Sequence, residues 1–146
     1  SRNLLRILEA ARAAGHDDRL RDLYVEYGRR IHHEGRRLWD PAEALRAAGL
    51  DEALAAAAGD ETWDEPLLRR MNEGLALVGN DVGTPIVSVI GTDGTEVALF
   101  GPVITKYPDE AKALELWDAF VTLATYSDFW ELKRTRTVRP EFRDAP

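Results

Sequence analysis

One short stretch differs in periodicity from the rest of the chain. Residues 86–100, "IVSVIGTDGTEVALF", read as strand, tight turn and strand, and Asp93-Gly94 supplies the turn because glycine takes positive φ without steric cost. The first strand is apolar on both faces, and such strands usually lie inside a covered sheet. A two-stranded hairpin alone is marginal in water. The hairpin 86–100 therefore predicts a partner: further strands outside residues 1–146, or the same hairpin of a second copy.

Runs of helical period fill most of the remaining chain. Residues 1 to about 60 are expected to be helical with no strand, because four such runs are punctuated by glycine. A longer helix is expected over 62–78, another over about 108–126, and a short one in "SDFWEL". The buried stripe of the helix at 62–78 is expected to be Leu67, Leu68, Met71, Leu75 and Val78.

Two of these helices carry start signals. Asp17 or Asp18 is expected to cap the second helix, "DDRLRDLYVEYGRRIHHEG", because a short side-chain oxygen can accept an orphan N–H of the first turn. Asp40-Pro41 opens the third helix, since proline fits the first helical position. Glu43 stands where a capping-box acid belongs.

Composition excludes several function classes. The 146 residues carry 19 basic and 26 acidic side chains, a net charge of −7, which argues against a general nucleic-acid binder or a binder of anionic membranes. No apolar run approaches the ~20 residues of a membrane span. The chain has no cysteine, so it has no thiolate chemistry of its own. We expect a cytoplasmic protein.

A proline stands at the entrance to the first strand, in "GTPIVSV". At this place its missing N–H breaks no ladder bond. Together with "DVGTPIVSV", the stretches "FGPVITK", "LWDAFVTLATYSDFWELKRTRT" and "GRRIHHEG" resemble the DsbA-like, mycothiol-dependent nitroreductase family over essentially the whole chain. The resemblance implies an α/β, thioredoxin-like fold with a helical insertion, of which this chain supplies the insertion (1–60), the C-terminal α-β-β-α half (61–132) and a basic tail (133–146). It also implies a cis bond between Thr84 and Pro85.

The resemblance further implies a function. The parent protein would be a thiol-dependent oxidoreductase, a mycothiol-dependent nitroreductase or disulfide reductase, with mycothiol as reductant, no metal, and a small electrophilic or disulfide substrate. Its Cys-x-x-Cys unit lies outside these residues, so no catalytic residue is expected in this chain. The segment would supply a substrate wall at Gly83, Thr84 and Pro85, where backbone groups can pair with an extended thiol, and a helical lid.

Three further residues are candidates for substrate or thiol binding. His32 could line the cleft between insertion and thioredoxin domain, although a positive charge near a helix end also suits the helix dipole. Trp39 could stack on a flat substrate or simply pack. Asp109 lies where a helix start could hold a thiol's carboxylate, or it caps that helix. Adjacent His32 and His33 project apart on a helix and make poor metal ligands.

Two alternatives remain open from the sequence. Kappa-class glutathione transferases and 2-hydroxychromene-2-carboxylate isomerases resemble DsbA but place a serine where the cysteine would be, which suits a cysteine-free chain. A non-catalytic interaction module is the alternative from a different class.

Overall fold

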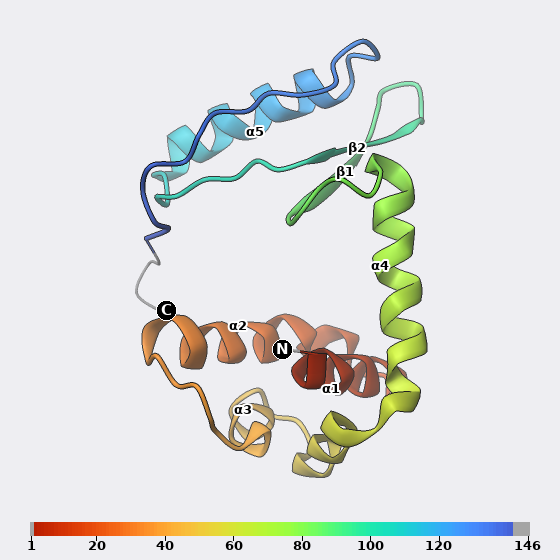
Figure 1. Ribbon diagram of the computed structural model, residues 1–146, viewed down its shortest axis with the longest axis vertical. Coiled ribbons are helices and arrows are strands. Elements are labelled where there is room, and N and C mark those ends of the chain that lie inside the picture. Colours follow the sequence, from red (N-terminus) through yellow and green to blue (C-terminus); the bar gives the residue numbers. More distant parts are fainter. Residues whose placement is uncertain (1, 142–146) are drawn as a thin grey trace. The chain divides into compact units, whose positions relative to one another are not determined.

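The computed structural model describes residues 2–141, which divide into two compact units, 2–71 and 72–141. Unit 1 is helical (Figure 1). Residues 2–60 contain no strand, which confirms the prediction for this part of the chain. Its elements are α1 (Arg2–Ala13), η1 (Asp17–Arg19), α2 (Leu20–Gly28), η2 (Arg29–His33), α3 (Pro41–Ala47), η3 (Glu52–Gly59), η4 (Glu61–Trp63) and the start of α4 (Asp64–Val78).

A single apolar cluster holds unit 1 together. Ile7 of α1, Leu23 of α2 and Leu45 of α3 are its largest fully buried side chains. The helix α1 packs against η3 and α2, and α3 packs against α2 and η3. Small residues complete the cluster, which lets the short helices approach closely: Ala10, Ala11, Ala44, Ala48 and Ala57. The stability of unit 1 therefore rests on helix packing.

Helix starts in unit 1 confirm one prediction and correct two. The Asp40 carboxylate accepts a hydrogen bond from Ala42 N–H at 2.9 Å, and Pro41 is the first residue of α3, as predicted. Capping by Asp17 or Asp18 is wrong: the second helix starts with a 3-10 turn, and the Asp17 carboxylate accepts instead from Arg12 at 2.9 Å. The capping-box role of Glu43 is also wrong, because Arg36 binds its carboxylate at 2.8 and 3.1 Å.

Unit 2 contains the end of α4, the strands β1 (Ile86–Ile90) and β2 (Glu96–Phe100), and α5 (Glu110–Ala124) (Figure 1). The strands form the predicted antiparallel hairpin, with Ile86 opposite Phe100 and Ile90 opposite Glu96. Gly94 has φ +81°, and the Asp93 carboxylate accepts from Thr95 N–H at 2.9 Å. The hairpin therefore turns at Asp93-Gly94, as the sequence predicts.

Two further predictions are wrong. Residues 127–132 form no helix; a turn closed by Phe129 N–H on the Tyr126 carbonyl, at 3.0 Å, follows α5. No described side chain of α4 is buried, and Met71 is 51% exposed. Helical spacing shows which side chains share a face, but burial also needs an element that packs on that face.

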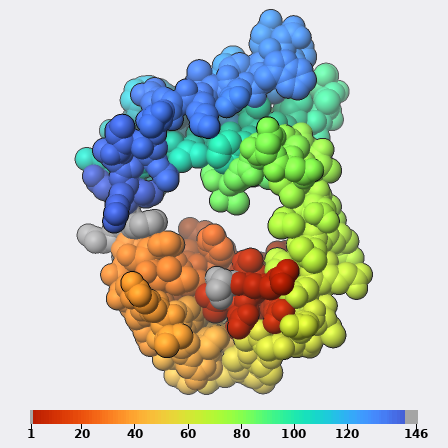
Figure 2. Space-filling view, in the orientation of Figure 1, coloured from red at the N-terminus to blue at the C-terminus, as the bar shows by residue number. Residues whose placement is uncertain are grey.

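Unit 2 buries fewer hydrophobic side chains than unit 1 among the described residues. The buried hydrophobic residues among its described part are Phe120 and Ala124. Phe120 stacks on Trp117, with ring centroids 5.8 Å apart, yet Trp117 remains 49% exposed. The segment that follows α5 is exposed along most of its length and forms the blue surface in Figure 2. Across residues 2–141, no helix has the length and apolar character needed to cross a membrane.

Candidate functional site

Gly83, Thr84 and Pro85 form an exposed backbone segment at the entrance to β1. Gly101 N–H donates to the Pro85 carbonyl at 2.8 Å, and Pro85, which has no N–H, cannot return a bond. The Thr84–Pro85 bond is cis, the isomer that the resemblance implied, and so is Gly101–Pro102. The hairpin ladder thus reaches Pro85 and stops there.

Thr84 keeps its polar backbone groups available. Within residues 2–141, neither its N–H nor its C=O hydrogen-bonds to another residue. The neighbouring Gly83 lies close to the Phe100 ring. A Cβ added at Gly83 would lie 3.6 Å from Phe100 Cε2, in ordinary van der Waals contact. This segment can therefore offer one donor and one acceptor to an extended ligand beside the end of the hairpin.

Asp109 is the N-cap of α5. Its carboxylate accepts from Lys112 N–H at 2.8 Å. The capping interpretation is therefore confirmed for this side chain. An acidic ligand at this helix start would meet the Asp109 carboxylate as well as the remaining N–H groups.

His32 and Trp39 belong to unit 1, whereas the other four candidate residues belong to unit 2. His32 lies in the π-helical turn η2 and is exposed. Trp39 is half-buried: its ring lies 5.7 Å from the Tyr27 ring, and the Arg30 guanidinium lies 5.4 Å from its centroid. Tyr27 and Arg30 already contact the Trp39 ring, so a planar ligand could stack only on the part of the ring surface that these two side chains leave exposed.

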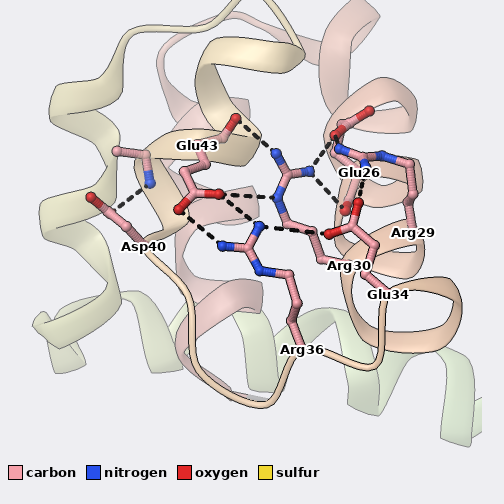
Figure 3. Close-up of polar contacts among 8 residues, drawn as sticks. Glu26, Arg29, Arg30, Glu34, Arg36, Asp40 and Glu43 are labelled. Carbon is pink, nitrogen blue, oxygen red and sulfur yellow. Dashed lines mark hydrogen bonds and ion pairs between the residues drawn. The ribbon is translucent and has the colours of Figure 1, made fainter.

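A charged network surrounds Arg30 in unit 1, and the sequence reading missed it (Figure 3). Arg30 is only 4% exposed. Its guanidinium donates to the Glu26 carbonyl at 3.2 Å, to the Glu43 carbonyl at 3.1 Å, and to the Glu26 carboxylate. Arg36 binds Glu43 from the other side, at 2.8 and 3.1 Å. The i, i+4 spacing of Glu26 and Arg30 was the available sequence signal.

This network determines the protonation of its acids. The hydrogen bond from Arg29, with another from Arg30, holds the pKa of Glu26 below its ordinary value. The hydrogen bond from Arg36 does the same to the pKa of Glu43. Both carboxylates are thus charged near neutral pH and fully engaged, which makes a general acid or base role unsuitable for them. The network ties α2 and η2 to α3 and so positions the loop that carries Trp39.

One buried hydroxyl has no partner. Tyr27 is 4% exposed, and its hydroxyl finds no hydrogen-bond partner among the described residues. Burial raises the pKa of this phenol well above its ordinary value, so it stays neutral. Over residues 2–141, no group of three or more His, Asp or Glu side chains is arranged to hold a metal ion.

A family model matches residues 3–134, which cover nearly all of unit 1, most of unit 2 and every candidate residue. The model is described as Rv2466c-like, mycothiol-dependent nitroreductase Rv2466c. The chain therefore belongs to the Rv2466c-like family. The activity for which this family is named is that of a thiol-dependent oxidoreductase.

Proposed function

We propose that the chain is part of a mycothiol-dependent reductase that acts on a nitro compound or a disulfide. The family match over residues 3–134 is the observation that carries this proposal. The chain has no cysteine, so the thiolate that exchanges with mycothiol comes from outside residues 1–146. In this proposal unit 1 serves as the helical lid, and unit 2 supplies the substrate wall at Gly83, Thr84 and Pro85.

The backbone of Thr84 supports the assignment of the wall. Thr84 is exposed, its N–H and C=O are without partners in the described chain, and the Pro85 ring stands next to them. An extended thiol could pair with both groups as a strand does, while the proline ring gives an apolar contact. Trp39 and Asp109 are secondary candidates, since both already have internal partners. His32, which lies in η2 of unit 1, is also a secondary candidate.

The redox chemistry balances with thiols alone. Oxidation of two mycothiol thiols to one disulfide releases two electrons and two protons. The same two electrons and two protons convert a substrate disulfide into two thiols, or a nitro group into a nitroso group and water. This chain's residues then bind and orient the reactants, and an outside cysteine relays the electrons.

The test has two stages. The purified chain should show no reduction of a nitroaromatic or of a disulfide with mycothiol. Joined to a β-α-β segment with Cys-x-x-Cys from another family member, it should turn over. In that protein Thr84→Pro or Pro85→Ala should lower turnover more than the tail change Arg139→Ala. Equal effects of the three changes would remove the support for the wall. A joined protein that stays inactive would favour a non-catalytic module, and activity with serine replacing the cysteine would favour the glutathione-transferase-like alternative.

A further inference from the structure

We propose that a pocket in unit 1 binds a small amphipathic carboxylate, in which an apolar body carries a single negative charge, as in a medium-chain fatty acid. The proposal does not use the redox function or the wall at Thr84. The pocket has a volume of about 380 Å³ and belongs entirely to unit 1. Its lining residues come from three helices: Leu5, Leu8, Glu9 and Arg12 of α1, Leu20, Arg21 and Tyr24 of α2, and Leu67 of α4.

The helix α1 presents two different faces. Ile7 and Ala10 are buried in the core cluster of unit 1. Leu5, Leu8 and Arg12 repeat at the i, i+3 and i+7 spacing of one helix face, and all three line the pocket. Leu8 also packs against the core cluster, whereas Leu5 remains 39% exposed. The pocket therefore continues from the core of unit 1 and keeps apolar surface open to a ligand.

The other walls come from α2 and α4. Leu20 packs against the core cluster, and Tyr24 is 64% exposed. Arg70 of α4 donates to the Glu9 carboxylate of α1 at 3.0 Å, and Leu67 lies one turn before Arg70 on the same helix. This ion pair joins α4 to α1 beside the pocket. Small-molecule sites are concave, mostly apolar, largely preformed and about 300–1,000 Å³ in volume, which is the kind of site that these walls make.

The acid in the pocket lining already has partners. Glu9 is 7% exposed. Its carboxylate accepts the hydrogen bond from Arg70, and its other oxygen lies 3.8 Å from Arg12 Nε. Arg12 in turn donates to the Asp17 carboxylate at 2.9 Å. These two cations and two anions balance one another, so Glu9 does not make the pocket selective for a positively charged ligand.

Arg21 is the charge that determines the sign of the ligand. It lines the pocket and is exposed, and its guanidinium has no hydrogen bond or ion pair with another residue in the described part of the chain. The neighbouring acids Asp18 and Asp22 pair with Arg19, at 3.5 and 3.7 Å, and do not line the pocket. A guanidinium binds a carboxylate through two parallel hydrogen bonds. The pocket therefore offers apolar walls for the body of the ligand and one open cation for its carboxylate.

The test titrates the whole chain with decanoate and with decylammonium, which carries a positive head, by calorimetry and amide NMR. Decanoate should bind saturably with a Kd below roughly 1 mM and shift the amides of Leu5, Leu8 and Tyr24. Decylammonium should bind at least roughly tenfold more weakly, because Arg21 repels its head. Arg21→Gln should weaken decanoate binding roughly tenfold. The matched control is Arg69→Gln, at an exposed arginine of α4 outside the pocket, and it should leave the affinity unchanged. No saturable binding of decanoate, or equal affinity for the two amphiphiles, overturns the proposal.

A second pair of variants tests the apolar wall. Leu67 and Leu68 are neighbours on α4, but only Leu67 lines the pocket, and Leu68 is 39% exposed. Leu67→Glu places a carboxylate in the wall, so it should abolish decanoate binding, whereas Leu68→Glu adds the same charge outside the pocket and should retain it. Far-UV circular dichroism should show that both variants keep the helices of unit 1. Decanoate that binds both variants alike, or neither of them, does not occupy this pocket, and either result overturns the assignment.

Discussion

Replacing Arg30 tests whether the buried charged network holds unit 1 together. Arg30→Ala removes charge-assisted hydrogen bonds to two backbone carbonyls, at 3.2 and 3.1 Å, and the cation over Trp39 at 5.4 Å. A hydrogen bond to a charged group contributes about 1.5–3 kcal/mol, and a cation–π contact about 0.5–2 kcal/mol. Breaking a buried pair costs about 3–5 kcal/mol when the other charge is left alone. Glu26 keeps Arg29 as a partner, so the lower ends of these ranges apply, and we expect a loss of about 3.5 kcal/mol.

The assay is urea unfolding followed by far-UV circular dichroism, because unit 1 is helical. Arg30→Lys keeps the charge, but a single ammonium cannot reproduce the guanidinium fork, so it should recover less than half of the loss. The matched control is Arg29→Ala, which removes a more exposed partner of the same carboxylate and should cost clearly less. If Arg30→Ala unfolds at the same urea concentration as the unmodified chain, the network does not stabilise unit 1 and this reasoning is wrong.

Three other changes test the packing and the protonation of unit 1. Leu45→Ala should cost about 2–5 kcal/mol in urea unfolding, because it opens a cavity at a fully buried site, whereas Leu38→Ala at a 94% exposed site should be nearly silent. Tyr27→Phe removes a buried hydroxyl without a partner, so it should leave the free energy of unfolding unchanged or raise it by about 1 kcal/mol; a loss above that would reveal an unseen partner. Because the folded pKa of Glu26 is depressed, its contribution to stability is present above its ordinary pKa and is lost as the pH falls through the depressed value. Glu26→Gln should flatten that acid limb in pH-dependent urea midpoints, and an unchanged limb would contradict the assignment.

Local signals in the sequence were sufficient for most elements. Asp40-Pro41 started α3 because the cap and the fixed φ act within one turn. Asp93-Gly94 made the hairpin turn because a positive φ is needed at one residue, which is a property of that residue alone. The position of Pro85 at the entrance to β1 was also predictable, since a proline suits a place where the ladder needs no N–H.

Tertiary structure decided what depends on partners from other elements. Asp17 offered a cap, but Arg12 binds its carboxylate, so the second helix starts without that cap. Glu43 had the spacing of a capping box, yet Arg36 binds its carboxylate. The loop that holds Arg36 meets α3 at Glu43, where Arg30 of η2 also donates to the Glu43 carbonyl. Residue spacing fixes which side chains are near in one helix, but a competing guanidinium from another element is visible only once the chain has folded.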